Sequence, residues 1–300
     1  MNSGDEAVWQ WPLERVKQVT DAVTAGRDLT PDVWPNGARV VVALSFDFDA
    51  ETGWLYRDLH SPASLARGAY GARVGVPRIL KLLEEMEIPA SFFIPAVAGQ
   101  LHPQSVDEIL KGGHEVGVHG WIHELASDLT PDQERELLGR SFDYWAERLG
   151  HPPAGIRTPS WDLTPFTLGI LRDLGFMYDS SLMGDDRPYE LMVAGEATGM
   201  VELPVEWLLD DYPYLQIMRE SGFLPYIKPD DVLEIWKREF EVARDEGTML
   251  LLTMHPQVIG HRSRWGMLKD LVSFLKEQQG VWFARHDEIA RHVAPEESKS

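Results

Sequence analysis

Cysteine is absent from the 300-residue chain, and basic residues are few. Without cysteine there are no disulfide bonds, no thiolate metal ligands and no cysteine nucleophile, so a bound metal must be held by His, Asp or Glu. Lys and Arg number 28 against 48 Asp and Glu, and the formal net charge is −20. So acidic a chain lacks the basic surface that binds phosphates. We expect neither nucleic acid nor a membrane as a partner.

Long hydrophobic runs are also missing. No apolar stretch approaches the roughly 20 residues that cross a bilayer. Residues 1–6 have neither the basic nor the apolar region of a secretory signal. We therefore expect a cytoplasmic protein. The hydrophobic content of 44% is enough for one large domain.

Strand and helix patterns alternate along most of the chain. Strands are expected at residues 40–49, 90–94, 114–119, 154–157, 176–179, 200–205, 248–254 and 281–283. Helical patterns lie between them, and a capping box with proline at its second position, residues 130–133, begins one of these helices. Roughly seven strand–helix units without a linker predict a single α/β domain built as a parallel barrel.

The domain boundaries follow from composition. Residues 38–294 are expected to form the barrel, residues 1–37 an N-terminal arm, and residues 295–300 a disordered tail. The arm is expected to contain one helix around residues 12–25 and to pack on the domain or on a neighbouring subunit. The glycine-rich stretch 68–75 is expected to be a loop, and it lacks the spacing of a dinucleotide-binding site.

Polar residues follow the ends of several expected strands. The stretch 40–49 is apolar until it ends in Asp47 and Asp49, and the later candidates are His119, His123, Arg157, Asp179 and His255. In a parallel barrel the C-terminal ends of the strands meet at one rim, where active sites lie. The sequence therefore predicts an active site built from these side chains.

His119 and His123 are the strongest candidates for metal ligands, because a His-x-x-x-His spacing brings two imidazoles within reach of one ion. Two His and one carboxylate leave open positions on the metal, as a catalytic site requires. Such an ion lowers the pKa of its water and polarises a carbonyl. One aspartate can then bind the metal while the other takes a proton from the water.

Arg157 and His255 have less certain roles. Arg157 either keeps the basic aspartate ionised or forms a structural salt bridge. His255 ends an apolar strand, where a polar side chain is costly unless it is paired or used. A protonated His255 could donate a proton to a departing amine.

These blocks resemble the motifs of the polysaccharide deacetylase family, whose NodB-homology domain is a distorted (β/α)7-type barrel. Residues 45–49, Ser-Phe-Asp-Phe-Asp, are similar to the first motif, and the resemblance implies that Asp47 is the general base and Asp49 a metal ligand. Residues 119–123, His-Gly-Trp-Ile-His, are similar to the second motif, which supplies both metal histidines.

Two further blocks complete the resemblance. Residues 157–161, Arg-Thr-Pro-Ser-Trp, look like the third motif, whose Arg positions the base, and residues 252–256, Leu-Thr-Met-His-Pro, look like the last, whose His is the general acid. The family also has an Asp that orients this His, and for that role the resemblance favours Asp210 over Asp179. The carboxylates here are Asp-x-Asp, whereas the family pattern has adjacent Asp-Asp.

Residues 75–82, 178–183 and 208–213 are most similar to a branch of intracellular peptidoglycan-deacetylase-like proteins, which includes cyclic-imide hydrolases and allantoinase-like enzymes. Aromatic residues of the expected rim loops, Trp54, Trp161 and Tyr212, are candidates for substrate binding. Together they suggest a partly closed pocket, which suits a small substrate better than a polymer. The resemblance also implies a homo-oligomer, with a tetramer as one option.

The leading hypothesis is a metal-dependent hydrolase of non-peptide carbon–nitrogen bonds that acts on an N-acetyl amide of an amino sugar. The alternative is the ring opening of a cyclic imide or ureide, which needs nearly the same groups. A distant alternative is a non-haem iron oxygenase, because two His and one carboxylate also form its metal site. Zinc suits an imidazole and carboxylate site for hydrolysis, so one divalent ion, zinc before others, is the expected cofactor.

Overall fold

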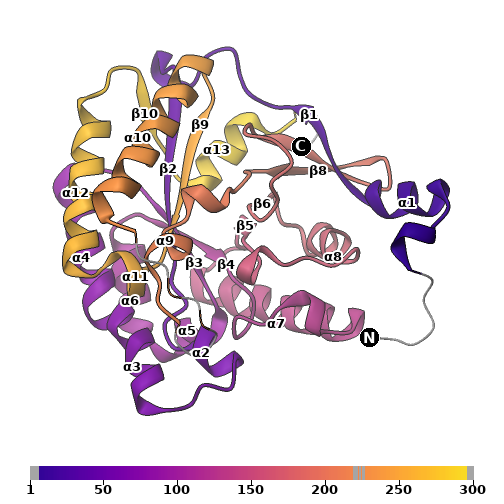
Figure 1. Cartoon of the computed structure of the whole chain (residues 1–300), viewed down its shortest axis with the longest axis horizontal. Helices are drawn as coiled ribbons and strands as arrows, with labels where there is room; N and C mark the ends of the chain where they lie inside the picture. Colours follow the sequence, from indigo (N-terminus) through magenta and orange to yellow (C-terminus); the bar gives the residue numbers. More distant parts are fainter. Residues whose placement is uncertain (1–6, 219–221, 223, 225–226, 296–300) are drawn as a thin grey trace.

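The computed structural model describes residues 7–218, 222, 224 and 227–295. The expected disordered tail lies, apart from residue 295, outside this part of the chain. A ten-stranded sheet organises the fold (Figure 1). In spatial order its strands are β1 (Val23–Asp28), β7 (Tyr189–Val193), β8 (Glu196–Glu202), β6 (Tyr178–Asp179), β5 (Gly155–Ile156), β4 (Glu115–Val118), β3 (Ser91–Ile94) and β2 (Val40–Asp47), with β10 (Val281–Phe283) and β9 (Met249–Met254) both paired to β2.

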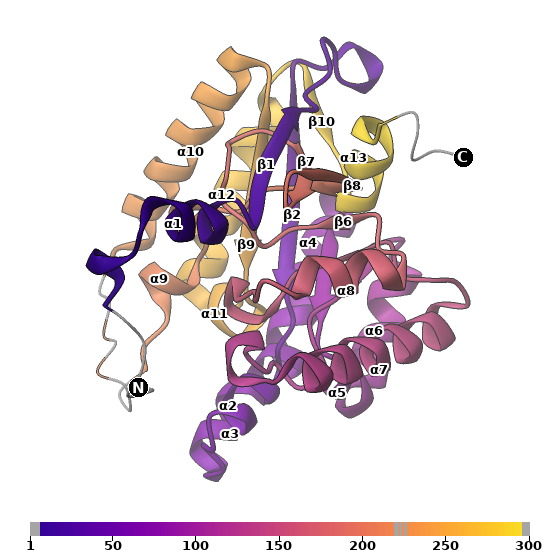
Figure 2. The ribbon, with the colours of Figure 1, turned by 90° about the vertical axis from the view of Figure 1, so that its right-hand side faces the viewer.

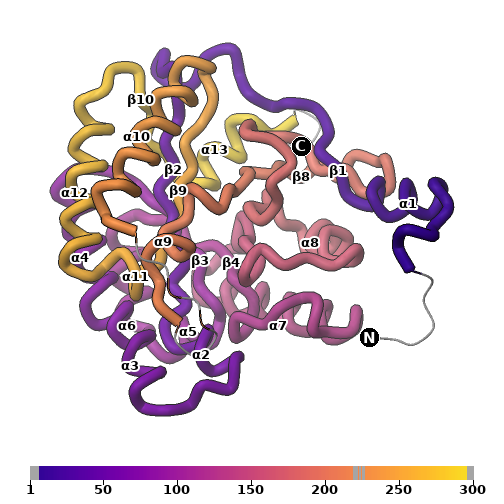
Figure 3. The backbone as a smooth tube through the Cα atoms, viewed as in Figure 1, coloured from indigo at the N-terminus to yellow at the C-terminus, as the bar shows by residue number. Residues whose placement is uncertain are grey.

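The strands from β8 through β2 to β9 and β10 all pair in parallel, and only β1 and β7 run antiparallel to their neighbours. Beyond β8, Asp210 forms a parallel bridge with Thr253 of β9. The backbone N–H of Asp211 also donates to the Thr253 carbonyl at 3.2 Å. The two ends of the parallel sheet are thereby drawn together, which confirms the predicted distorted (β/α)7-type barrel. Figure 3 shows that the late strand β9 returns beside β2.

Strand β2 is buried along its whole length. Its even-numbered residues, such as Val42 and Leu44, pack in the cluster shared with the outer helices. Val41 and Ala43 pack in a second cluster with Phe93 and other residues of the barrel interior. Because side chains alternate along a strand, Asp47 continues the inward-facing row, so the strand places this carboxylate in the mouth of the barrel.

Helices surround the sheet (Figures 1 and 2). Those around the outside include α4 (Val76–Met86), α6 (Pro103–Lys111), α7 (Pro131–Leu149), α8 (Thr167–Leu174), α10 (Pro229–Glu246), α12 (Arg262–Glu277) and α13 (His286–Val293). Helix α3 (Pro62–Tyr70) and the short helices α2 (Thr52–Tyr56), α5 (Ala96–Leu101), α9 (Tyr212–Leu215) and α11 (Pro256–Ile259) lie toward the C-terminal ends of the strands. Within the described residues no helix has the length and apolar character needed to cross a bilayer.

The N-terminal region differs from the prediction. The expected helix over residues 12–25 is confined to α1 (Leu13–Thr20), and the chain then forms β1. Strand β1 pairs with β7, which the sequence analysis did not expect, and extends the sheet at its antiparallel edge (Figure 2). The prediction missed β1 because Val23–Asp28 contains Gly26, Arg27 and Asp28 and has no apolar alternation.

The expected glycine-rich loop at residues 68–75 is also wrong. This segment is helical, comprising the end of α3 and a π-helical turn at Gly71–Gly75. A Cβ at Gly68 would lie 2.3 Å from the Ala50 carbonyl oxygen, and one at Gly75 would lie 2.2 Å from that of Pro256. The glycines therefore let this helix approach the two loops that follow β2 and β9.

Candidate active site

The C-terminal ends of β2, β4, β5 and β9 bring the predicted residues together in the mouth of the barrel. All of them are buried: Asp47, Asp49, His119, His123, Arg157, Asp210 and His255. Groups of this kind are expensive to bury unless they are paired or bind a ligand. Their convergence agrees with the rule that parallel barrels place chemistry at the ends of their strands.

Asp49, His119 and His123 form a candidate metal centre. Oδ1 of Asp49 lies 3.5 Å from Nε2 of His119 and 3.8 Å from Nε2 of His123. The three potential ligand atoms all lie within 4.8 Å of one another. Oδ1 of Asp49 is buried without a hydrogen-bond partner among the described residues. A divalent ion fits this arrangement, because it would supply the partner that the oxygen lacks.

Neighbouring groups leave these ligand atoms available. The Arg157 carbonyl oxygen lies 2.6 Å from Nδ1 of His119. Because a carbonyl only accepts, the proton of the neutral ring is on Nδ1 and the Nε2 lone pair is free. Nε2 of Gln257 donates to Oδ2 of Asp49 at 3.1 Å, which leaves Oδ1 exposed to the centre. Such outer contacts orient metal ligands in known sites.

A tight turn explains how His119 and His123 face the same point. Gly120 has a φ of 72° and His123 a φ of 67°, so the chain reverses within these few residues. The Glu124 carboxylate accepts the backbone N–H of Trp121 at 2.8 Å and that of Ile122 at 2.6 Å. These bonds hold the turn together.

Asp47 is paired with Arg157. The fully buried Arg157 donates from Nη1 to Oδ1 of Asp47 and to Oγ of Ser45, both at 2.8 Å. Burial raises the pKa of Asp47, but the positive groups around it, Arg157 foremost, outweigh burial and hold that pKa below its ordinary value. Asp47 is therefore a carboxylate ready to accept a proton. Oδ2 of Asp47 lies 3.8 Å from Nε2 of His119, next to the metal centre.

Further residues hold Arg157, and the sequence analysis missed them. Nε donates to the Ser180 carbonyl and Nη2 to its hydroxyl, each at 3.0 Å. Nη2 also lies 3.3 Å from Nε2 of His286. Burial and the charge of Arg157 hold the pKa of His286 well below its ordinary value, so this ring is neutral and accepts the bond. His286 follows β10, and the rule of strand ends could have identified it.

The carboxylate that hydrogen-bonds to His255 is that of Asp211, whereas the sequence analysis chose Asp210. Nδ1 of His255 lies 2.8 Å from Oδ1 of Asp211 and 3.5 Å from Oδ1 of Asp210. Asp211 also accepts the backbone N–H of His255, while Asp210 accepts that of Tyr212. Asp179, the other option, lies on β6 and accepts a bond from Ser181. Because Asp210 and Asp211 are adjacent, the sequence alone could not decide which of them bonds to His255.

The two carboxylates favour the charged form of His255. Burial lowers the pKa of His255, but Asp210 and Asp211 outweigh it, and the pKa lies well above its ordinary value. Burial raises the pKa of Asp210 to about 8. Nε2 of His255 lies 4.0 Å from Oδ2 of Asp49, so its proton is close to the metal centre. His255 can therefore act as a proton donor.

A pair of variants separates the two carboxylates. Asp211→Asn is expected to lower kcat about 10²–10⁴-fold, because the amide can no longer stabilise the charged ring or fix its orientation. Asp210→Asn is expected to lower kcat less than about tenfold, because Asp210 lies 3.5 Å from Nδ1 of His255 and its hydrogen bond comes from the backbone N–H of Tyr212, which an amide oxygen also accepts. Steady-state kinetics of both variants checks this. An equal loss in the two, or a larger loss in Asp210→Asn, would contradict the assignment.

The aromatic candidates occupy different places. The Tyr212 ring lies 5.2 Å from that of His255. Trp54 lines a cavity of about 260 Å³ whose wall includes Gln257, the residue that donates to Asp49. Trp161 packs on Trp207 with ring centroids 4.1 Å apart and belongs to the apolar cluster of the barrel interior. The structure thus places Trp54 and Tyr212 near the chemistry and gives Trp161 a packing contact.

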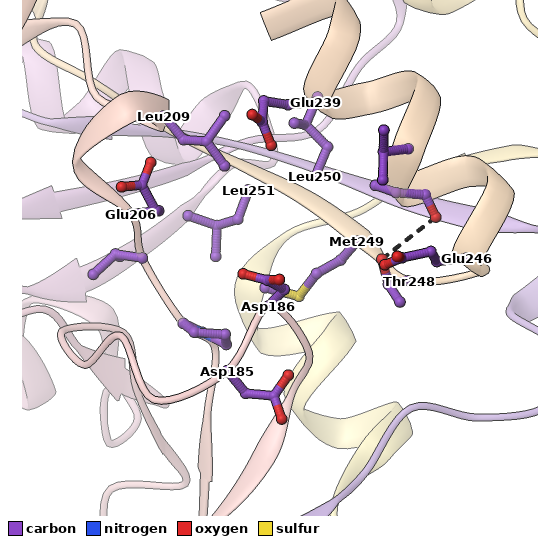
Figure 4. A pocket seen from close by; sticks show the side chains of 14 residues that line it. Asp185, Asp186, Glu206, Leu209, Glu239, Glu246, Thr248, Met249, Leu250 and Leu251 are labelled. Atoms are coloured by element: carbon purple, nitrogen blue, oxygen red, sulfur yellow. Dashed lines mark hydrogen bonds between the residues drawn. The ribbon is translucent and has the colours of Figure 1, made fainter.

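The smaller pocket in Figure 4 is separate from this site. It has a volume of about 90 Å³ and lies along residues 248–251, at the N-terminal end of β9, whereas His255 follows the other end. Its acidic lining residues are Asp185, Asp186, Glu206, Glu239 and Glu246. The candidate catalytic and metal-binding residues are not among those that line it.

The fold and the site define an α/β-barrel hydrolase of carbon–nitrogen bonds other than peptide bonds. The family model described as polysaccharide deacetylase matches residues 39–178. A peptidoglycan deacetylase from Helicobacter pylori is 30% identical over 278 residues, which are 84% of this chain and 95% of the relative. The chain therefore belongs to the polysaccharide deacetylase family.

Other relatives and solved structures are similar to this chain along most of its length. A peptidoglycan deacetylase-like protein from Gibberella zeae is 27% identical over 84% of this chain and 86% of its own. A solved structure from Mycobacterium smegmatis, assigned as a polysaccharide deacetylase, is 36% identical, with a TM-score of 0.82 over 88% of this chain and 93% of that one. The structure of PuuE allantoinase is 27% identical, with a TM-score of 0.75 over 89% of this chain and 96% of that one.

Proposed function

We propose that this chain is a metal-dependent amide hydrolase in which Asp49, His119 and His123 hold one divalent ion, zinc being the best suited. The observation that carries the proposal is the buried Oδ1 of Asp49, which lacks a protein partner in the described residues and lies 3.5 Å and 3.8 Å from two imidazole nitrogens. A carboxylate oxygen buried in this way is costly without a cation or donor.

When bound, the ion supplies Lewis-acid polarisation of the amide carbonyl and lowers the pKa of water. Asp47 takes the proton of the attacking water, and Arg157 keeps this base ionised and oriented through its 2.8 Å hydrogen bond. His255 gives a proton to the leaving nitrogen. Asp211 holds the ring of His255 through Nδ1, so that Nε2 faces the reacting groups.

Two substrate classes fit these groups. The H. pylori and G. zeae relatives are named for peptidoglycan deacetylation, which supports removal of an acetyl group from an amino sugar. The likeness to PuuE allantoinase and the cavity of about 260 Å³ favour ring opening of a small cyclic imide or ureide. In both cases Trp54 and Tyr212 are the proposed walls of the substrate site. The cytoplasmic location and the homo-oligomeric state stay predictions from the sequence.

Mass spectrometry of products tests the proposal. Zinc-loaded protein is incubated with a mixed pool of acetylated amino sugars and cyclic imides or ureides, and a metal-stripped sample is the control. Zinc-dependent loss of an acetyl group would establish deacetylation. Zinc-dependent addition of one water to a ring compound would establish ring opening. Turnover that is the same in the metal-stripped control would contradict the proposal.

A further inference from the structure

One side chain, Gln257, links the cavity that Trp54 lines to the candidate metal centre. Gln257 contributes to its wall, and the same side chain donates from Nε2 to Oδ2 of the metal ligand Asp49 at 3.1 Å. Trp54 belongs to α2, which begins just after Asp49. A group bound in this cavity therefore lies beside the reacting centre. At about 260 Å³ the cavity holds a compact group and no long polymer.

The charged side chains that line this cavity are basic. Arg67, His261 and Arg264 contribute to the wall, and the described lining contains no Asp or Glu. This composition is unusual in a chain with a formal net charge of −20. Burial and the nearby charges of Arg264, Arg78 and Arg67 lower the pKa of His261. The three arginines therefore create a local positive field on one side of the active site.

Hydrogen bonds to backbone carbonyl oxygens hold these guanidinium groups in place. Arg264 donates from Nη1 to the Val258 carbonyl at 3.1 Å, and Arg78 donates from Nη1 to the Gly260 carbonyl at 2.7 Å. Arg67 donates to the Ile217 carbonyl. In the described part of the chain, no carboxylate forms an ion pair with Arg78 or Arg264. Carbonyl contacts orient a guanidinium but leave its charge available.

Aromatic rings form other parts of the cavity wall. Tyr70 stacks on His261 with ring centroids 4.0 Å apart and planes 3° apart. The guanidinium of Arg67 lies over the ring of Trp54, 5.5 Å from its centroid. Flat apolar walls beside fixed guanidinium groups suit a small planar or cyclic frame that carries an anionic group.

From these observations we propose that the cavity is a carboxylate-binding subsite, and that the substrate is a compact amide, imide or ureide with a carboxylate on the side away from the scissile bond. The planar fork of a guanidinium matches a carboxylate and binds it through charge-assisted hydrogen bonds. The inference rests on the proposed function for its link to catalysis. The preference for an anion, however, follows from the cavity alone.

Matched pairs of ligands test the subsite. Dihydroorotate and dihydrouracil are cyclic ureides that differ by one carboxylate, and N-acetylmuramic acid and N-acetylglucosamine are acetylated sugars that differ by a carboxylate-bearing substituent. Calorimetric titration of the zinc-loaded full chain is expected to show at least about tenfold tighter binding of the acid in one pair. The pair that shows the preference identifies the carbon frame.

Variants on helix α12 assign the preference to one residue. Arg264→Gln is expected to reduce the ratio of acid affinity to neutral-ligand affinity to about one, and Arg264→Lys is expected to keep part of that ratio. Arg262→Gln is the matched control, because Arg262 is exposed on the same helix and does not line the cavity. The proposal is overturned if neither acid binds more tightly than its neutral partner, or if Arg264→Gln leaves the ratio unchanged.

The same titrations on metal-stripped protein separate this inference from the proposed function. A carboxylate can also bind zinc, so the acid preference must persist without the metal if the arginines cause it. If metal-dependent hydrolysis fails while the acid preference and its loss in Arg264→Gln remain, the subsite stands and the proposed chemistry does not. A preference that disappears with the metal overturns the subsite and leaves the hydrolase proposal intact.

Discussion

Replacing Asp47 by Asn is expected to lower kcat about 10²–10⁴-fold while the protein still binds its metal. Asn has the shape of Asp but cannot take a proton from water, so only the base is removed. The three proposed metal ligands, Asp49, His119 and His123, are left in place. The retained metal therefore distinguishes loss of the base from loss of the metal site.

The measurement compares turnover and metal content in the same preparation. Asp173→Asn is the control, because Asp173 lies on α8, is about half exposed and forms ion pairs with the surface residues Arg135 and Arg172. That variant is expected to have the activity of the wild type. Full activity in Asp47→Asn would show that Asp47 is not the general base. Loss of the metal from this variant would show that Asp47 is itself a metal ligand.

Arg157→Leu is expected to lower the free energy of unfolding by about 3–5 kcal/mol and to abolish turnover. Arg157 is fully buried and bonds to Asp47, Ser45, Ser180 and His286. Without the guanidinium, Asp47 is a buried carboxylate that has lost the cation hydrogen-bonded to it, and the pKa of Asp47 is expected to rise. The variant would therefore lose stability and the ionised base together.

Denaturant unfolding measures the stability change. Arg135→Leu is the control, because the ion pair of Arg135 with Asp173 is about half exposed, and its loss should cost about 0–1 kcal/mol. Arg157→Lys keeps the positive charge but loses the planar guanidinium group. Because this variant is expected to fold better than Arg157→Leu, it is the one in which activity is tested. A loss in Arg157→Leu no larger than in the control would contradict the role given to Arg157.

The barrel and most of its site could be predicted because their signals are local. The apolar run of β2 and the two carboxylates after it are one continuous stretch, and the alternation of a strand decides which side chains face inward. The two metal-binding candidates His119 and His123 are four residues apart. The turn at Gly120 and His123 lets both imidazoles face the same point in spite of this short spacing. Parallel topology then brings the remaining strand ends to the same rim.

The parts that the sequence did not reveal depend on contacts between distant segments. Strands β1 and β7 stabilise each other, and neither has a clear pattern of its own. Asp210 and Asp211 are adjacent and chemically identical, so only the path of the chain beside β9 decides that Asp211 bonds to His255. Gln257, which donates a hydrogen bond to Asp49, could have been predicted as a site residue, because it lies two residues after His255.

The most direct test of the central claim is a zinc titration of the metal-stripped protein, with binding followed by calorimetry and activity followed on the same samples. We predict that one zinc ion binds tightly per chain, that activity rises in proportion to bound zinc and saturates at one equivalent, and that His119→Ala loses both binding and activity. Activity in the absence of metal, or unchanged zinc binding in His119→Ala, would contradict it.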